Sequence, residues 1–257
     1  MTADEALRQF RLDGAVAAIT GGARGIGGAT AELFAAVGAR VAILDLDHEA
    51  AQALAQRIGP SATAHRLDVG SEREVDHVFE TLVRDEGRID ILVNNAGIAI
   101  RKPTTELTLA DWQRVVDINM TGVFLCSRAA GRAMMARGSG AIVTTGSIMG
   151  LSGGGIYPNI SYQTTKGAIV NFTRALAVEW SRSGVRVNAV APTWVDTEFI
   201  APLKAKPELI AEIRRMTPMG RLAQPHEVAN AILFLASPAA AMITGHVLPV
   251  DGGFLAQ

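Results

Sequence analysis

The segment Ala15–Gly27, AVAAITGGARGIG, joins an apolar run of strand length to a glycine-rich turn. A helical pattern follows directly, because apolar residues recur at spacings of three and four from Ile26 to Val37. An unbroken apolar run fits a strand that is covered on both faces, as in a parallel sheet. Strand, glycine turn and helix in this order predict the first half of a βαβ unit.

The glycine turn is also a candidate phosphate-binding site. Gly21 permits the tight turn, Gly25 lets the backbone approach a pyrophosphate, and Gly27 lets the helix pack close to the strand. The start of a helix presents unpaired N–H groups and the positive end of its dipole to an anion. The spacing is Gly-x3-Gly-x-Gly rather than the commoner GxGxxG, so the strand–turn–helix context is what indicates a dinucleotide site.

The next predicted strand, RVAIL, leads into Asp45. An acidic side chain at this place can accept hydrogen bonds from the adenosine ribose, and it repels a 2′-phosphate. NAD is therefore expected rather than NADP. Arg24 in the glycine turn argues the other way, because a cation there can receive a 2′-phosphate. An ordinary exposed turn residue is the alternative interpretation of Asp45.

Strands and helices continue to alternate along the chain, with no internal repeat, linker or second domain. Seven strands alternating with helices predict a single α/β domain, residues 1–257, built as a Rossmann-type, doubly wound parallel sheet with helices on both faces. The alternation stops at residues 194–218, which are expected to form a mobile substrate lid with one short helix, Pro207–Arg215. Long helices are predicted at Leu109–Ala136 and from Ser161 to about Arg182.

Composition and charge restrict the other function classes. The chain has 257 residues, 49% of them hydrophobic and 19% charged, which is enough to bury a large core. Its formal net charge of -1 gives no electrostatic reason to expect nucleic acid or an anionic membrane as a partner. A single cysteine, no basic-then-apolar leader and no apolar stretch of about 18 residues together favour a cytoplasmic protein. The histidines show no ligand spacing, so no metal is expected.

A second chemical signal is SYQTTK, Ser161–Lys166, in which Tyr162 and Lys166 stand four residues apart where a helix is predicted to begin. Residues at this spacing share a helix face, with Cβ atoms about 5–6 Å apart. An ammonium that close favours the phenolate by about two pKa units, which moves the tyrosine toward use as a proton donor and acceptor near neutral pH. Taken alone, the pattern also fits two solvent-facing helix residues.

Polar residues follow several of the predicted strands, at the edge where open α/β sheets bind ligands. The fourth strand runs into Asn95, Ala96 and Gly97, and the fifth ends at Ser147. Asn119 lies among apolar residues of a predicted helix, so its amide needs partners and it is either structural or part of a site. Asp68, at the end of the third predicted strand, TAHRLDV, is either a partner of an adenine amino group or an ordinary loop residue.

TGGARGIG, NNAG, Asn119, Ser147 and YxxxK resemble, in order and spacing, the short-chain dehydrogenase/reductase family, over roughly residues 12–253. The resemblance implies that Tyr162 is the acid/base, that Lys166 lowers its pKa and holds the nicotinamide ribose, that Ser147 positions the substrate oxygen and that Asn119 holds a water in a proton relay. It also implies a dinucleotide contacted by Gly21, Arg24, Gly25, Ile26, Gly27, Asp45, Asp68, Val69, Asn95, Ala96, Gly97, Tyr162, Lys166, Pro192, Val195 and Thr197.

The chain departs from the usual pattern of this family in two places. Pro192-Thr193 replaces the usual Pro-Gly, so a side chain enters near the nicotinamide. The loop between Ser147 and Tyr162 is longer than usual, as it is in relatives that act on sugar alcohols. Two further stretches, FRLDGAVAAITG and MTPMGRLAQPHEVANAILFLASP, also resemble polyol and sugar dehydrogenases. The resemblance therefore implies an NAD-dependent enzyme, commonly a homotetramer, that interconverts a secondary alcohol and a ketone on a polyol or related small polar substrate.

Residues with hydrogen-bonding groups near the predicted cleft are candidate substrate contacts: Tyr157, Asn159, Trp194, Glu198 and Arg101. Tyr157 and Trp194 fit ordinary packing under a lid equally well. Two other functions stay open. One is a reductase of 3-oxoacyl thioesters or other hydrophobic ketones, although the chain lacks the dense basic patch that an acidic carrier protein needs. The other is a dinucleotide-sensing regulatory protein, which need not keep a serine, a tyrosine and a lysine together.

Overall fold

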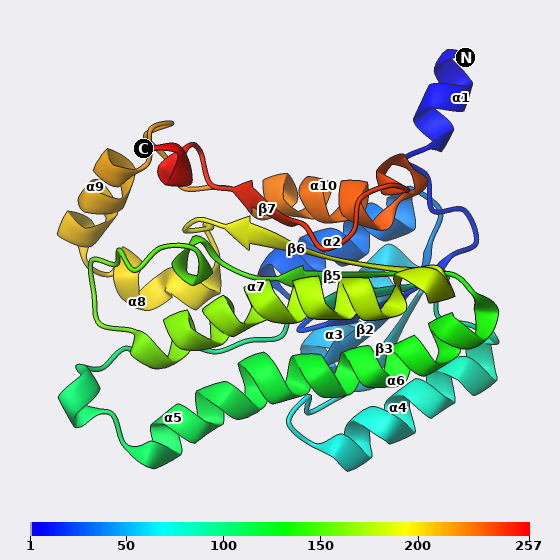
Figure 1. Cartoon of the computed structure of the whole chain (residues 1–257), viewed down its shortest axis with the longest axis horizontal. Coiled ribbons are helices and arrows are strands. Elements are labelled where there is room, and N and C mark those ends of the chain that lie inside the picture. Colours follow the sequence, from blue (N-terminus) through cyan, green and yellow to red (C-terminus); the bar gives the residue numbers. More distant parts are fainter. Residues whose placement is uncertain (1) are drawn as a thin grey trace.

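A computed structural model of the chain describes residues 2–257 and has one sheet with helices on both sides (Figure 1). All neighbouring strands are parallel, in the order β3-β2-β1-β4-β5-β6-β7. This confirms the predicted doubly wound parallel sheet of seven strands. The strands are β1 (Val16–Thr20), β2 (Arg40–Asp45), β3 (Ala62–Arg66), β4 (Ile91–Asn94), β5 (Gly140–Thr145), β6 (Val185–Pro192) and β7 (Val247–Val250).

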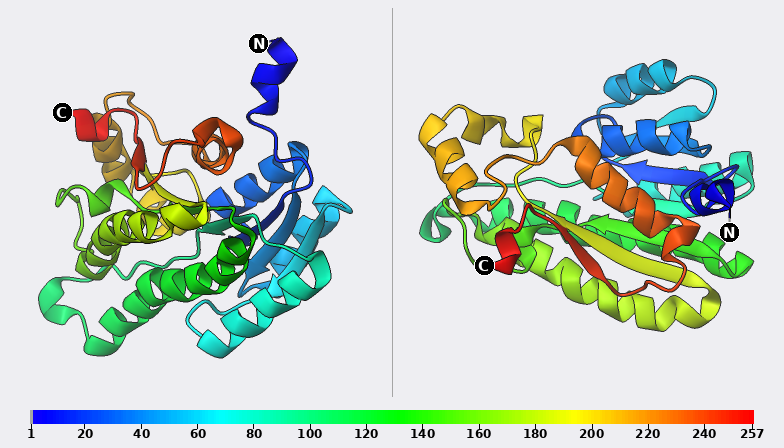
Figure 2. Two further views of the ribbon diagram at one scale, coloured as in Figure 1. Left: turned by 45° about the vertical axis from the view of Figure 1, so that its right-hand side comes forward. Right: turned by 90° about the horizontal axis from the view of Figure 1, so that it is seen from above.

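The two faces of the sheet are covered by different helices (Figure 2). Ala17 and Ile19 of β1 belong to the hydrophobic core on one face, whereas Ala18 between them belongs to the core on the other. This alternation explains why a central strand is apolar throughout. The first face is covered by α2 (Gly25–Ala36), α3 (His48–Ile58) and α10 (Pro225–Ala236), and the second by α4 (Glu72–Glu86), α6 (Gly122–Arg137) and α7 (Ile160–Trp180).

Helix starts show how the local sequence sets these elements. The side chain of Asp47 accepts the Ala50 N–H at the start of α3, and Ser71 does the same for Glu74 at the start of α4. Helix α2 differs, because the residue before it, Arg24, makes no side-chain cap. The first N–H groups of α2 are therefore left for another partner.

The long helix predicted at Leu109–Ala136 is present but is not uniform. Helix α5 (Leu109–Val116) passes through a π-helical turn, Asp117–Thr121, into α6. A π turn holds one more residue than an α turn and is frequent at functional sites. Asn119 lies within it.

Three expectations need correction. The segment 194–218 holds two helices, α8 (Ala201–Lys204) and α9 (Pro207–Met216), and a 3-10 turn, Glu198–Ile200, rather than one short helix. Strand β3 ends at Arg66, so Asp68 lies beyond the strand in the following loop. Strand β5 likewise ends at Thr145, two residues before Ser147. An apolar pattern in the sequence can continue beyond the last hydrogen bond between two strands. It therefore predicts that a strand is present more accurately than it predicts where the strand ends.

The remaining helix, α1 (Ala3–Arg8), precedes β1. Within residues 2–257, no helix is long and apolar enough to cross a bilayer.

Helices α6 and α7 meet where Trp180, at the end of α7, lies against Gly131 of α6. A methyl group added at Gly131 would overlap the Trp180 ring. By contrast, a methyl group at Gly167 of α7 would meet only the Gly150 carbonyl oxygen, at 3.8 Å. These two helical glycines form a matched pair, one tightly packed and one with room.

Gly131→Ala is expected to lower the free energy of unfolding, although alanine is a better helix former by about 1 kcal/mol. The reason is that overpacking a filled site costs about 1–3 kcal/mol. Gly167→Ala, as the control, should be neutral or slightly stabilising. Urea unfolding followed by circular dichroism measures both, and equal midpoints for the two variants would show that the contact with Trp180 is not tight.

Candidate active site

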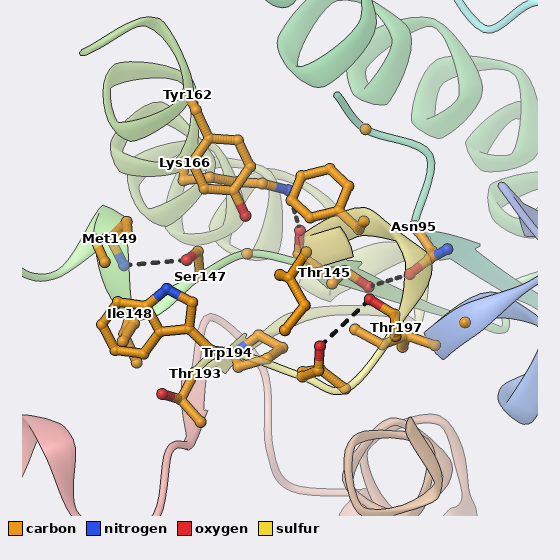
Figure 3. A pocket seen from close by; sticks show the side chains of 18 of the residues that line it. Asn95, Thr145, Ser147, Ile148, Met149, Tyr162, Lys166, Thr193, Trp194 and Thr197 are labelled. Carbon is orange, nitrogen blue, oxygen red and sulfur yellow. Dashed lines mark hydrogen bonds between the residues drawn. The ribbon is translucent and has the colours of Figure 1, made fainter. Parts of the chain in front are cut away.

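A cavity of about 500 Å³ lies at the carboxyl ends of β1, β4, β5 and β6 (Figure 3). The strand order reverses between β1 and β4, and the crevice at such a reversal is where open α/β sheets bind ligands. Most of the residues predicted to bind the cofactor or the substrate line this cavity: Gly21, Arg24, Gly25, Ile26, Asn95, Ala96, Gly97, Ser147, Tyr157, Asn159, Tyr162, Lys166, Pro192, Trp194, Val195, Thr197 and Glu198.

The glycine turn forms one end of the cavity. Gly21 and Gly25 have φ values of 58° and 55°, in the left-handed region that favours glycine. A Cβ at Gly21 would also lie 2.8 Å from the Ala96 Cα, so a side chain would fill the space between the turn and the loop after β4. Gly27 has no such torsion, but a Cβ there would overlap the Gly21 carbonyl. These positions suit a backbone that must approach a ligand closely.

Asn95 holds the floor of the cavity together by joining three strand ends. Its backbone N–H donates to the Thr20 hydroxyl at 3.0 Å, and its side-chain N–H donates to the Gly21 carbonyl at 2.9 Å. Its side-chain oxygen accepts the Thr145 hydroxyl at 3.2 Å. Asn95 therefore ties β1, β4 and β5 to the glycine turn.

The acidic residues at the glycine turn are engaged by its backbone and its arginine. The Asp45 carboxylate accepts the N–H groups of Ala23 and Asp47, each at 3.0 Å. Arg24 forms an ion pair with Asp47, with Nη2 and Oδ2 2.6 Å apart, and its Nε lies 4.0 Å from a Glu198 oxygen. The cation that argued for a 2′-phosphate is thus already paired, and this edge of the cavity carries an excess of carboxylates.

Five predicted residues do not line the cavity: Gly27, Asp45, Asp68, Val69 and Asn119. Asp45 lies just outside it, bonded to the turn through Ala23. Asp68 accepts the Gly70 N–H at 2.9 Å, and Val69 packs against Gly122. Both have the contacts of ordinary loop residues.

Tyr162, Ser147 and Lys166 meet at the other end of the cavity (Figure 3). Tyr162 and Ser147 both line this end of the cavity, and the Ser147 hydroxyl accepts the Met149 N–H at 3.1 Å. The Lys166 ammonium lies 5.5 Å from the centre of the Tyr162 ring and donates to the Thr145 carbonyl at 2.6 Å. The predicted shared helix face of tyrosine and lysine is thus present.

The predicted lowering of the Tyr162 pKa by this lysine is wrong. Burial raises the pKa of Tyr162 to about 12, against the opposing effect of the nearby Ser147 side chain. Burial also lowers the pKa of Lys166 to about 8. The ammonium faces the ring and the Thr145 carbonyl rather than the phenol oxygen, so removal of the phenolate from water outweighs the expected attraction.

Asn119 has all of its amide groups satisfied inside the protein. Its Oδ1 accepts the Ile98 N–H at 2.8 Å, and its Nδ2 donates to the Ile98 carbonyl at 2.9 Å and to the Thr165 hydroxyl at 3.2 Å. The side chain therefore joins the π turn to the loop after β4 and to α7. Because Thr165 immediately precedes Lys166, this link positions the helix that carries the tyrosine and the lysine.

The candidate substrate residues divide into packing and polar groups. Trp194 is buried, donates to the Tyr157 hydroxyl at 3.0 Å and packs edge-on against Phe254, which is the pattern of core packing. Glu198 is largely exposed and faces Arg24. Asn159 is buried, and its Oδ1 has no hydrogen-bond partner within the described residues.

Several lining residues were not predicted from the sequence: Thr145, Gly146, Ile148, Met149, Thr193, Phe199 and Ile200. Most are apolar or small, and such residues look the same in a sequence whether they face a core or a cleft. Thr193 is an exception, because the departure from Pro-Gly indicated that a side chain enters here. Within residues 2–257, no group of three or more acidic, histidine or cysteine side chains is placed to hold a metal ion.

Residues 21–255 match a family model described as enoyl-(acyl carrier protein) reductase. The chain is 44% identical to galactitol 2-dehydrogenase (L-tagatose-forming) of Cereibacter sphaeroides, over 95% of this chain and 96% of that protein. It is 38% identical to a 3-oxoacyl-[acyl-carrier-protein] reductase of Aquifex aeolicus, over 95% of this chain and 99% of that protein.

The solved structure of a gluconate 5-dehydrogenase from Burkholderia cenocepacia, in complex with NADP and tartrate, superposes with a TM-score of 0.94. It is 36% identical and covers 98% of this chain and 99% of its own. The sheet, the cavity at its reversal point and these full-length matches agree, and the chain belongs to the short-chain dehydrogenase/reductase family of oxidoreductases that act on CH–OH groups.

Proposed function

We propose that the protein is an NAD-dependent dehydrogenase that interconverts a secondary alcohol and a ketone on a polyol or related small polar substrate. The observation that carries this proposal is that Tyr162, Ser147 and Lys166 line one end of a cavity whose other end is the glycine turn. One end of the cavity can move a proton on a substrate oxygen, and the other can hold the phosphates of a dinucleotide.

The residues at the glycine turn fit a dinucleotide. The uncapped start of α2 leaves N–H groups free for a pyrophosphate. Without side chains, Gly21 and Gly25 let the turn lie close to Ala96 and Thr197 at this end of the cavity. We propose that the predicted cofactor residues hold the dinucleotide here, with Asp45, Asp68 and Val69 at the adenosine end. When bound, the nicotinamide supplies the hydride acceptor or donor.

The role we propose for the side chains of the protein is to remove or return one proton on the substrate oxygen. During alcohol oxidation, the ionised Tyr162 oxygen removes the hydroxyl proton of the carbinol, and in the reverse direction the phenol returns it to the ketone oxygen. The Ser147 hydroxyl binds the same substrate oxygen. Because burial raises the pKa of Tyr162 to about 12, the phenolate needs a nearby positive charge, which the Lys166 ammonium, 5.5 Å from the ring centre, would supply while holding the nicotinamide ribose. For Asn119 we propose a positioning role, through Ile98 and Thr165, beside the water expected in the proton relay.

Two observations support a small polar substrate. The cavity near Tyr162 contains the polar groups of Asn159, Thr193 and Arg101 as well as apolar side chains. The relatives include a galactitol dehydrogenase and a gluconate dehydrogenase. The 3-oxoacyl reductase relative keeps a hydrophobic ketone as the second candidate. We also propose that residues 194–218 act as a substrate lid, since Phe199 and Ile200 line the cavity.

Tyr162→Phe is expected to lower turnover by about 1,000-fold, because it removes the proton-transferring oxygen and leaves the ring. NADH absorbance across a panel of polyols and an acetoacetyl thioester measures turnover, and fluorescence titration shows whether the dinucleotide still binds. Retained turnover would contradict the assignment. Faster reaction of the thioester than of any polyol would favour the 3-oxoacyl reductase. Tight NAD binding by the unaltered protein without turnover of anything in the panel would favour the regulatory protein.

We propose that the protein prefers NAD to NADP. The Asp45 carboxylate lies at the glycine turn, where it accepts the Ala23 N–H, and Arg24 is already paired with Asp47. Asp45→Asn keeps a hydrogen-bond acceptor for the Ala23 N–H but removes the charge. We expect the NAD-to-NADP ratio of kcat/KM to fall about 10-fold, or about 1.4 kcal/mol. Asp47→Asn, which removes a neighbouring charge and releases Arg24, is the comparison. Equal shifts in both variants would mean that net charge, not the position of Asp45, sets the preference.

We further propose a homotetramer in the cytoplasm. The support is apolar surface on the two long helices that cover one face of the sheet, where Phe124 of α6 is 45% exposed and Val178 of α7 is 79% exposed. Light scattering is expected to give four times the chain mass of 27.0 kDa. A monomer mass at micromolar concentration would remove this proposal.

A further inference from the structure

Arg101, in the loop after β4, is a half-buried cation at the substrate end of the cavity. Its guanidinium carbon lies 5.4 Å from the centre of the Tyr157 ring and 5.4 Å from the centre of the Phe199 ring. Its Nη2 makes a long hydrogen bond, 3.4 Å, to the Phe199 carbonyl. Aromatic contacts of this kind fix the plane of a guanidinium and leave its N–H edge available.

Arg101 differs from the other cations of the cavity because it has no acidic partner. Arg24 is paired with Asp47, and Lys166 donates to the Thr145 carbonyl. Across residues 2–257, no carboxylate lies within 4.0 Å of the Arg101 guanidinium. Glu198 comes just before Phe199, which contacts Arg101, but its carboxylate is directed toward Arg24. The substrate end of the cavity therefore carries an uncompensated positive charge.

Phe199 connects this charge to the reacting end. Its ring lies 6.0 Å from the Tyr162 ring, centre to centre, and also contacts the Arg101 guanidinium. Arg101 is one of the charges that act on the Tyr162 phenol. A molecule whose carbinol is held at Tyr162 and Ser147 can therefore reach Arg101 with the far end of a short carbon chain.

Polar atoms without partners lie along the same cavity. They are the Oδ1 of Asn159, a residue that is 4% exposed, and the Nε of Arg101. Buried polar groups are normally hydrogen-bonded, so unpaired ones on residues that line a cavity are candidate ligand contacts.

We propose that Arg101 binds a carboxylate at the end of the substrate remote from the reacting carbinol, so that the substrate is a hydroxylated carboxylic acid rather than a neutral polyol. Asn159 receives a hydroxyl group between these two ends. A guanidinium with a free edge matches a carboxylate in shape as well as charge. This inference rests on the proposed dehydrogenase function and names the substrate class of the same site.

Matched pairs of acids and alcohols test the proposal. D-gluconate is compared with D-glucitol, D-xylonate with xylitol and D-threonate with D-threitol, each with NAD. The unaltered enzyme is expected to show a kcat/KM at least 10-fold higher for the best acid than for its alcohol. In Arg101→Gln the acid-to-alcohol ratio should fall at least 30-fold, chiefly through KM for the acid. Arg101→Lys keeps the positive charge but cannot donate two parallel hydrogen bonds, so its acid-to-alcohol ratio should fall less than that of Arg101→Gln.

Two controls separate this role from a structural one. Arg114→Gln removes an exposed arginine of α5 that does not line the cavity, and the acid-to-alcohol ratio should stay as in the unaltered enzyme. Calorimetric titration of D-gluconate into the NADH complex gives a readout without turnover, and the dissociation constant should rise at least 10-fold in Arg101→Gln. If the Gln variant does not fold, the same titration is made on Arg101→Lys, where a rise of at least threefold is expected.

An unchanged acid-to-alcohol ratio in Arg101→Gln, or a preference of the unaltered enzyme for the neutral alcohols, would overturn the proposal and leave the dehydrogenase function intact. Absence of turnover with every compound would instead remove the proposed function. In that case, gluconate binding that does not depend on Arg101 would remove the carboxylate site as well.

Discussion

A parallel sheet that is buried on both faces needs a helical crossover between successive strands, and this constraint organises the rest of the molecule. Every crossover returns the chain to the same edge, so all the strands end together. At the reversal between β1 and β4 the crossovers leave to opposite faces, and the cavity opens there. The glycine turn, the polar loop after β4 and the tyrosine helix are brought together by this topology, although they are far apart in the chain.

Burial determines the protonation state of the tyrosine and the lysine. With the pKa of Tyr162 near 12 and that of Lys166 near 8, the phenol is neutral and the amine is mostly protonated at neutral pH. The amine bonds to the Thr145 carbonyl, and Asn119 fixes the neighbouring Thr165. Burial thus sets the pKa values of both groups, while these hydrogen bonds fix where the lysine and the start of its helix lie.

The two ends of the cavity differ in charge. At the glycine turn, Asp45 and Asp47 accept backbone N–H groups, and the one nearby arginine is paired. At the end that holds Tyr162, Arg101 lies against two aromatic rings, and no carboxylate within residues 2–257 forms an ion pair with it. The charge at the glycine turn is therefore mainly negative, and the charge near Tyr162 is positive.

The sequence by itself determined the fold and the main chemical groups, because both are expressed in local patterns. Apolar runs, the glycine turn and the Tyr162–Lys166 spacing depend only on residues close together in the chain, and the predicted sheet follows from them. Only the tertiary structure decided that the pKa of Tyr162 is raised, which groups bond to Asn119, and that Arg101 has no acidic partner within residues 2–257. Those depend on desolvation and on contacts such as that between Arg101 and Phe199, which chain spacing does not encode.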